Sequence, residues 1–312
     1  AGIKEVGVII SPETGDEIRS TMGDGSKWGL KLVYILQSEP KGLAHAVTTG
    51  RAFLGDSSFV MYLGDNLIGC GIEKFVETFK KTKSDAVILL KPVDNPSAFG
   101  VAEVDGSGRI LRLEEKPKNP KSNLALVGVY IFSPEVHSSI ANIRPSNRGE
   151  LEITDAIQDL ISAGRTVHSH VLDTWWLDTG KKDDLLAANT LVLDEWFKRK
   201  IAGKVDEKSQ LTGRVTIEEG AVVKNSILRG PMVVGSGAII EDSFIGPFTS
   251  IGEGALIKKS IIEHCVILSG AEISHIERLE DSLIGRNAKV IKCHHKHEAL
   301  RLMIGDDSVV EV

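Results

Sequence analysis

The stretch Phe59-Val60-Met61-Tyr62-Leu63-Gly64-Asp65-Asn66 decides the fold of the first part of the chain. Its five apolar residues run without a break into Gly64 and Asp65, a pattern typical of a buried parallel strand. Ligands of open α/β sheets bind just outside the carboxyl ends of the strands, where we expect Asp65 to lie. Two interpretations remain open for Asp65: a carboxylate that holds a metal ion or a hydroxyl group, or an N-cap of a helix near residues 71–79.

Predicted strands and helices alternate on both sides of this stretch. We expect strands at 5–10, 32–37 and 85–91 and helices at 13–22, 42–54 and 72–80. This alternation predicts a largely parallel sheet with right-handed crossovers. Further along the chain we expect a hairpin (101–104 and 110–114), strands at 124–132 and 166–172, and helices at 134–141, 152–163 and 181–198. Residues 1–201 are therefore predicted to form an α/β domain with a mixed sheet.

The last third of the chain repeats with a period of 17 residues. Three sets of aliphatic residues keep this step in phase: Ile217, Val234 and Ile251; Val223, Ile240 and Ile257; Leu228, Ile245 and Ile262. Each period thus supplies three inward positions, which predicts a triangular coil of three short strands. We expect about five stacked coils, a parallel β-helix over residues 215–312, after a polar linker at 202–214.

Composition and charge exclude several classes of protein. The 312 residues carry a net charge of −6, and no basic patch suited to nucleic acid is evident. No apolar run is long enough to span a membrane, and no signal peptide is recognisable at the start. The three cysteines, Cys70, Cys265 and Cys293, are far apart and form neither a disulfide framework nor a zinc motif. We therefore expect a cytoplasmic protein that binds neither nucleic acid nor membrane.

Four short stretches are candidates for chemistry, and each has a purely structural alternative. Gln37 to Ala44 could present a Gln side chain to a base edge, or simply connect a strand to a helix. Glu114-Glu115-Lys116 could bind a sugar and a phosphate, or form a solvated charge run. Arg148 could clamp a phosphate, or pair with Glu150 or Glu152. Asp178 could share one Mg²⁺ with Asp65, or cap the following helix.

Histidines of the last third suggest a weaker hypothesis. The run Lys292-Cys293-His294-His295-Lys296-His297 resembles a metal site, but consecutive residues do not converge on one ion, so we predict a basic surface loop. His264 and His275 fall on the predicted β-helix. One of them could serve as the base of an acyltransferase, or both could lie on solvated coil faces.

Taken together, six motifs resemble the sugar-1-phosphate nucleotidylyltransferases, and within that family the long form of the glucose-1-phosphate thymidylyltransferases. These motifs are residues 37–44, 63–66, 99–101, 114–117, 149–155 and 177–180, and the ending 301–306 also resembles the long form. The resemblance implies a Rossmann-like nucleotidyltransferase domain followed by a left-handed β-helix. It also implies a homo-oligomer, with dTTP (or UTP) and glucose 1-phosphate as substrates and Mg²⁺ as cofactor.

The resemblance further assigns roles to particular residues. Gln37 and Gly42 would meet the base, and Asp65 and Asp178 would hold Mg²⁺. Gly100, Glu115 and Tyr130 would surround the sugar. Lys116 and Arg148 would contact the sugar phosphate, and with Asp65 they would form the catalytic set.

One departure from the family pattern shapes our expectations. Members begin with a strand and a G-x-G-T-R-L-x-P loop that wraps the triphosphate, and no such run occurs in this sequence. We therefore expect this chain alone to be inactive. Two other hypotheses stay open: a bifunctional, UTP-using enzyme whose β-helix transfers acetyl groups, and a non-catalytic regulatory subunit.

Overall fold

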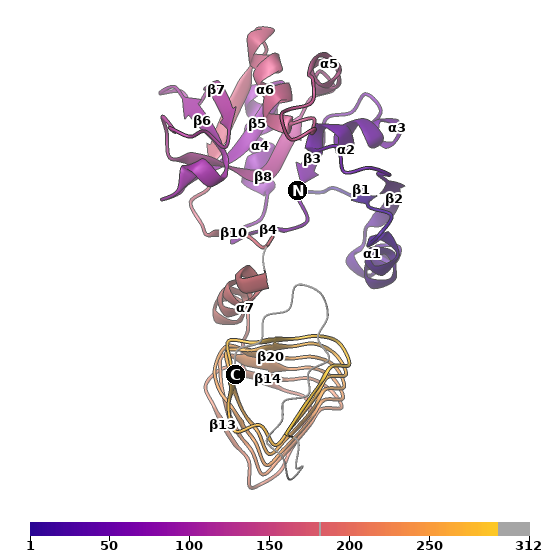
Figure 1. Cartoon of the computed structure of the whole chain (residues 1–312), viewed down its shortest axis with the longest axis vertical. Coiled ribbons are helices and arrows are strands. Elements are labelled where there is room, and N and C mark those ends of the chain that lie inside the picture. The colour runs from indigo at the N-terminus through magenta and orange to yellow at the C-terminus, as the bar shows by residue number, and fades with distance from the viewer. Residues whose placement is uncertain (181, 293–312) are drawn as a thin grey trace. The chain divides into compact units, whose positions relative to one another are not determined.

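The chain divides into two compact units, Ala1–Thr179 and Gly180–Val312 (Figure 1). The computed structural model describes residues 1–180 and 182–292. The predicted histidine-rich loop from Cys293 onward and the apolar ending at 301–306 lie outside these residues. Helix α7 (Lys182–Glu195) belongs to the second unit, and the boundary placed after residue 201 remains a prediction.

A mixed sheet forms the centre of the first unit. Its strands are β3 (Phe59–Tyr62), β5 (Ala86–Pro92), β6 (Gly100–Val104), β7 (Ile110–Glu115), β8 (Leu124–Phe132) and β9 (Val167–Val171). They follow the order β7-β6-β8-β5-β9, with β3 also paired to β8. Only β5 and β9 run parallel within it. The mixed sheet is therefore confirmed, whereas the expectation of a largely parallel sheet is wrong.

The stretch Phe59–Asn66 differs most from its prediction. Strand β3 pairs antiparallel with β8, Phe59 opposite Phe132 and Tyr62 opposite Val129. It is only partly buried, and Tyr62 is exposed. An apolar run reports burial but carries no information on strand direction, which depends on a partner about 70 residues away in the sequence. The prediction of a buried parallel strand is therefore wrong.

Helices cover both faces of this sheet. They are α2 (Leu43–Thr49), α3 (Arg51–Leu54), α4 (Glu73–Thr82), α5 (Val136–Asn142) and α6 (Ile153–Ser162). Alternate residues of β5 point to opposite faces, so Ile88 joins a cluster with Ile157 of α6, while Val87 joins Phe75 of α4. All three of these β5 and α6 side chains are fully buried. The predicted helix at 42–54 divides into α2 and α3 at Gly50.

Two separate pairs of strands, one parallel and one antiparallel, complete the first unit. Strands β1 (Glu5–Ile10) and β2 (Lys31–Leu36) pair in parallel, with α1 (Gly15–Met22) between them in sequence. Strands β4 (Asn66–Ile68) and β10 (Trp176–Asp178) pair antiparallel, Asn66 opposite Asp178. The second pair was not predicted, because three-residue strands are too short to show a periodicity.

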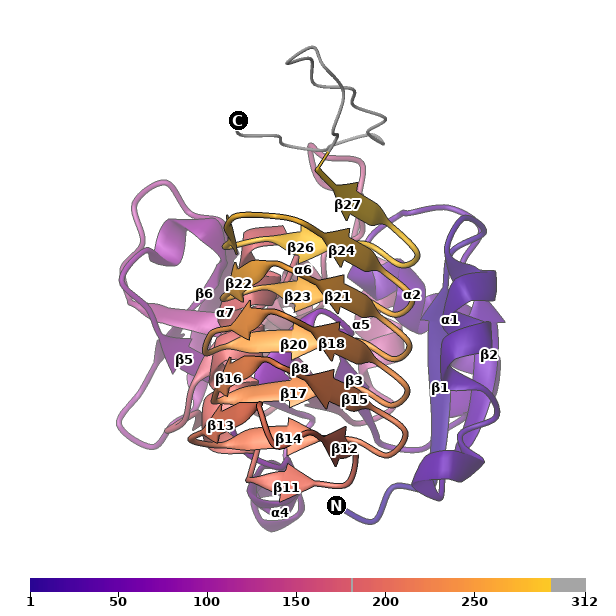
Figure 2. The same ribbon diagram turned by 90° about the horizontal axis from the view of Figure 1, so that it is seen from below.

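The second unit is a parallel β-helix, in which strands one coil apart lie side by side (Figure 2). Two of its three sheets contain six strands and the third contains five, as expected for about five coils. One sheet holds β11 (Lys200–Ile201), β14 (Val215–Ile217), β17 (Met232–Val234), β20 (Thr249–Ile251), β23 (Val266–Ile267) and β26 (Leu283–Ile284). The next holds β12 (Lys204–Val205), β15 (Val222–Lys224), β18 (Ile239–Glu241), β21 (Leu256–Lys258), β24 (Glu272–Ser274) and β27 (Lys289–Ile291). The third holds β13 (Gln210–Thr212), β16 (Ile227–Arg229), β19 (Phe244–Ile245), β22 (Ile261–Glu263) and β25 (Leu279–Glu280).

The predicted inward positions are the core of this unit. All nine aliphatic residues of the three in-phase sets are buried, with Ile251 the most exposed of them at 2%. The pairing of Ile257 with Ile273 shortens the step to 16 residues, so the 17-residue period does not hold at this coil. The segment 202–214 predicted as a linker contains β12 and β13, which pair with β15 and β16. Its inward residues Val205 and Leu211 lie opposite Val223 and Leu228, so this segment already belongs to the stacked coils.

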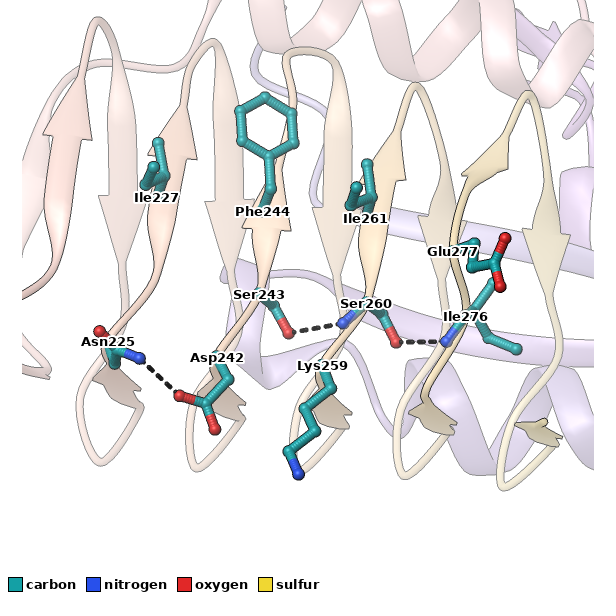
Figure 3. Close-up of a pocket in the computed structure, with 10 residues that line it drawn as sticks. All are labelled: Asn225, Ile227, Asp242, Ser243, Phe244, Lys259, Ser260, Ile261, Ile276 and Glu277. Carbon is teal, nitrogen blue, oxygen red and sulfur yellow. Dashed lines mark hydrogen bonds between the residues drawn. The ribbon is translucent and has the colours of Figure 1, made fainter. Parts of the chain in front are cut away.

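One corner of the coils carries a ladder of serines (Figure 3). The backbone N–H of Ser243 donates to Ser226 Oγ at 3.1 Å, and that of Ser260 donates to Ser243 Oγ at 3.2 Å. The N–H of Ile276 continues the ladder to Ser260 Oγ at 3.1 Å. Because a buried N–H needs a partner, these hydroxyls satisfy the backbone where the coil turns between sheets.

A pair of adjacent isoleucines tests the packing of the coils. Ile240 points inward and is fully buried, whereas Ile239 is 36% exposed. We expect Ile240→Ala to lower the free energy of unfolding of this unit by about 2 to 5 kcal/mol, because it opens a cavity. Ile239→Ala should change it by less than about 1 kcal/mol. Urea titration followed by circular dichroism measures both; equal losses would contradict the assigned inward face.

Candidate active site

A cavity of about 230 Å³ lies in the first unit, between the β6–β7 hairpin, β8 and the start of α6. Six of the nine predicted site residues line it: Gly100, Glu115, Lys116, Tyr130, Arg148 and Asp178. The structure thus brings together residues 78 positions apart in sequence. Its apolar wall includes Phe99 and Trp176, whose ring centroids lie 5.1 Å apart. Gln37, Gly42 and Asp65 do not line this cavity.

The β6–β7 hairpin builds one side of the cavity. Gly100 lies opposite Glu115, and a Cβ at Gly100 would approach Thr154 Cγ2 to 3.0 Å and Glu115 Oε2 to 3.1 Å. Glycine therefore keeps this side open. Thr154 Oγ1 donates to Glu115 Oε2 at 3.3 Å. Lys116 follows with a φ of 42°, in the left-handed region, and its N–H donates to Phe99 O at 3.1 Å.

Charge and burial shape the chemistry of Glu115 and Tyr130. Burial raises the pKa of the Glu115 carboxyl, and the nearby Glu152 carboxylate raises it further. Lys116, Arg148 and the hydrogen bond from Thr154 act in the opposite direction on this pKa. Burial also raises the pKa of the Tyr130 hydroxyl, with a smaller contribution from Glu115. Tyr130 is therefore a neutral phenol at physiological pH, able to donate or accept a hydrogen bond in the cavity.

Arg148 is held by carboxylates. Its Nε and Nη2 donate to Glu152 Oε1 at 3.2 and 2.9 Å, and Nη2 also reaches Glu152 Oε2 at 2.9 Å. Nη2 lies 3.5 Å from Glu150 Oε2 and 4.0 Å from Glu115 Oε1. The hydrogen bond to Glu152 raises the pKa of Arg148. The alternative of pairing with Glu150 and Glu152 is thus confirmed, and it coexists with a position in the cavity wall.

The predicted base-binding segment adjoins the loop that carries Arg148. A Cβ at Gly42, whose φ is 95°, would lie 2.6 Å from Leu151 O, so only glycine fits this approach. Leu151 N–H donates to Lys41 O at 2.8 Å, and Ala44 N–H donates to Leu151 O at 3.1 Å. Gln37 is half-buried, and its Nε2 lies 2.8 Å from His45 Nδ1. The segment therefore lies next to the cavity through Leu43, which lines it.

Asp65 and Asp178 occupy neighbouring positions of the β4–β10 pair. Asp178 lies opposite Asn66, and the N–H of Thr179 donates to Asp65 O at 2.8 Å. Both side chains are exposed. Asp65 does not cap α4, which begins at Glu73 with Ile72 as its N-cap, so that alternative is wrong. Asp178 is the last residue of a strand.

Asn66 and Thr154 were not singled out from the sequence, and Glu152 was considered only as an alternative partner of Arg148, although each lies inside a quoted motif. All three line the cavity and are buried. Asn66 Oδ1 accepts hydrogen bonds from Gly128 N at 3.1 Å and Trp176 Nε1 at 2.6 Å, while its Nδ2 donates to Asp65 Oδ1 at 2.8 Å. The sequence signal that could have identified these three residues is a polar side chain close to a candidate ligand.

The β-helix bears a larger and more open hollow of about 640 Å³ along the serine ladder (Figure 3). No histidine lines it. His264 Nε2 lies 2.8 Å from Thr190 Oγ1 of α7, and its Nδ1 pairs with Asp281. Within residues 1–180 and 182–292, no group of three His, Cys, Asp or Glu is placed to bind a metal ion.

No helix among the described residues is long and apolar enough to cross a membrane. Cys70 and Cys265 are free thiols, the first exposed and the second buried.

Comparison with known proteins agrees with this arrangement. The nucleotidyl transferase family matches residues 1–195, and the GlmU-like C-terminal hexapeptide family matches residues 199–291. A glucose-1-phosphate thymidylyltransferase of Streptomyces griseus is 49% identical over 100% of this chain and 87% of its own length. The low-salt glycan biosynthesis nucleotidyltransferase Agl11 of Haloferax volcanii is 44% identical over 100% of this chain and 88% of its own length.

A solved structure from Bacillus anthracis, described as a glucose-1-phosphate thymidylyltransferase, is also similar. It is 36% identical, with a TM-score of 0.57 over 62% of this chain and 78% of its own. The hexapeptide match supports the predicted left-handed β-helix. The chain belongs to the nucleotidyl transferase family.

Proposed function

We propose that the protein transfers a thymidylyl group from dTTP to glucose 1-phosphate, releasing dTDP-glucose and pyrophosphate. One observation carries the proposal: a single cavity combines Glu115 and Tyr130, suited to sugar hydroxyls, with Lys116 and Arg148, suited to a phosphate. The names of relatives that match the whole chain support the same reaction.

The chemistry requires little covalent help from the protein. A phosphate oxygen of glucose 1-phosphate attacks the α-phosphorus of dTTP, a new P–O bond forms, and the bond to pyrophosphate breaks in line. Lys116 and Arg148 neutralise the charge of the sugar phosphate and orient its attacking oxygen. Gln37 would pair with the edge of thymine, a role it would serve equally for uracil.

A divalent cation fits the donor set of the β4–β10 pair. Asp65 and Asp178 offer carboxylate oxygens from neighbouring positions, and Mg²⁺ prefers one or two carboxylates together with substrate phosphates and water. These two residues would hold Mg²⁺, which when bound would offset negative charge on the triphosphate. The amide of Asn66 positions the Asp65 carboxylate through its hydrogen bond to Oδ1.

Two alternatives receive less support. An acetyltransferase site on the β-helix needs a histidine base, and no histidine lines the hollow along the serine ladder. A regulatory subunit has no need to retain Asp65, Lys116 and Asp178 together.

We also infer that copies of the chain associate through one face of the β-helix. Ile227 and Ile261 are 37% and 43% exposed at equivalent positions of different coils, with Phe244 between them. An apolar stripe of this kind is typical of a protein interface. Replacing Ile227 and Ile261 by Asp should shift the mass measured by light scattering towards the monomer. An unchanged mass would contradict this.

A panel of nucleoside triphosphates against sugar 1-phosphates tests the reaction. We expect product from dTTP and glucose 1-phosphate, with pyrophosphate release as the readout. Failure of the protein with every sugar 1-phosphate would refute the proposal.

Removal of either carboxylate tests the cation site. Asp65→Asn and Asp178→Asn keep the size of the side chain but remove its charge, so we expect at least a hundredfold loss of kcat, on the order of 3 kcal/mol. Asp173→Asn is a suitable control, since Asp173 is exposed and does not line the cavity. The Mg²⁺ concentration that gives half-maximal rate should rise in the first two variants only.

Because the pKa of Glu115 is raised, we expect its replacement by Gln to increase stability and to lower activity. A carboxyl whose folded pKa is raised stabilises the fold below its unfolded pKa, and this contribution is lost as pH rises through the folded value. Glu115→Gln copies the protonated form, so it should raise Tm at pH 8 and lose that advantage near pH 4. Activity should fall because the sugar loses an anionic acceptor. Thermal melts of the parent protein and of Glu115→Gln across this pH range measure the difference in Tm. A lower Tm for the variant at pH 8 would contradict the prediction.

A further inference from the structure

Glu152 is a buried carboxylate at the start of α6, only 7% exposed. A buried carboxylate is stable only with strong partners, and Glu152 Oε1 accepts from Arg148 Nε, Arg148 Nη2 and Ser146 Oγ. The Ser146 contact is 2.7 Å, and Ser146 Oγ in turn accepts from the backbone N–H of Arg148 at 3.2 Å. Ser146 and Glu152 thus hold Arg148 at both its backbone and its side chain.

The contacts with Glu152 occupy the Nε–Nη2 edge of the Arg148 guanidinium and leave Nη1 without a hydrogen bond among the described residues. An arginine has five N–H donors, on Nε, Nη1 and Nη2. Glu152 engages Nε and Nη2, and Nη2 also faces Glu150. Arg148 Nη1 makes no hydrogen bond to any residue in the described part of the chain. Since Arg148 lines the cavity, its two Nη1 donors remain for a ligand.

We propose that Glu152 is the positioning residue that fixes Arg148 by its Nε–Nη2 edge, so that Nη1 is presented to the phosphate of the sugar 1-phosphate. The inference rests on the proposed function and extends it. A long side chain loses several rotatable bonds when it clamps a ligand, and a partner that already holds it lowers this cost. Glu152 acts through Arg148 and does not itself touch the phosphate.

The opposite interpretation makes a different prediction. If Glu152 competed with the phosphate for Arg148, removing its charge would free the guanidinium and strengthen substrate binding. Positioning predicts weaker binding instead, confined to the sugar phosphate. The direction in which removal of the Glu152 charge changes KM for the sugar 1-phosphate therefore distinguishes positioning from competition.

The test is a double-mutant cycle in the protein. We expect Glu152→Gln to raise KM for glucose 1-phosphate about tenfold, the effect of losing one charged hydrogen-bond pair. KM for dTTP and kcat should stay within about twofold of the parent protein, which a general loss of structure would not spare. In an Arg148→Ala background, Glu152→Gln should have no further effect on KM.

Two further variants keep the proposal falsifiable. Ser146→Ala removes one hydrogen bond to Glu152 and should raise the same KM about two- to threefold, even if Glu152→Gln fails to fold. Asp159→Asn removes a charge from the same helix, away from the cavity, and should change nothing.

The outcomes separate the two claims. An unchanged or lower KM in Glu152→Gln, or an undiminished effect without Arg148, would overturn the role of Glu152. If the parent protein forms no product, the proposed reaction fails; calorimetric binding of glucose 1-phosphate to the same variants then decides on Glu152 by itself.

Discussion

The buried amide of Asn66 is the interaction on which the arrangement of the active site depends. Its Oδ1 accepts from the backbone of β8 at Gly128 and from the indole of Trp176 in β10, and both donors fix its orientation. Its Nδ2 must then donate outward, and it does so to Asp65. One side chain therefore joins the main sheet, the β4–β10 pair and a candidate metal ligand. A side chain at Gly128 would collide with it, since a Cβ there would approach Asn66 Nδ2 to 2.7 Å.

The β4–β10 pair shows what local sequence could and could not predict. From the residues alone, sharing one Mg²⁺ was only one of two interpretations of Asp65 and Asp178, because no spacing rule connects residues this far apart; the family resemblance favoured it. The structure brings them together through three paired positions, a ladder too short for any periodic signal. The same limit explains why the direction of β3 was wrong while its existence was right. Strand partners are tertiary choices, and an apolar run is compatible with either direction.

The β-helix was predictable in more detail because its contacts repeat. Each coil buries its three inward aliphatics against the coils before and after it, so one step in the sequence encodes one step in space. The register follows directly: Val223 lies beside Ile240, and Ile240 lies beside Ile257. The 17-residue repeat was not recognised at its N-terminal edge. At 202–214, polar residues that face solvent hid two inward positions, Val205 and Leu211.

The charge balance of the cavity wall determines how a nucleotide can enter. The cavity wall carries four carboxylates, Glu115, Glu150, Glu152 and Asp178, against the two cations Lys116 and Arg148. A wall with this balance repels phosphates unless something offsets its charge. Arg148 is already paired, and the raised pKa of Glu115 lets that group bind a proton more readily than usual. A proton on Glu115 would remove only one negative charge. A divalent cation at Asp65 and Asp178 would supply the rest where the triphosphate must approach, so the acidic wall itself favours entry of the nucleotide together with its metal ion.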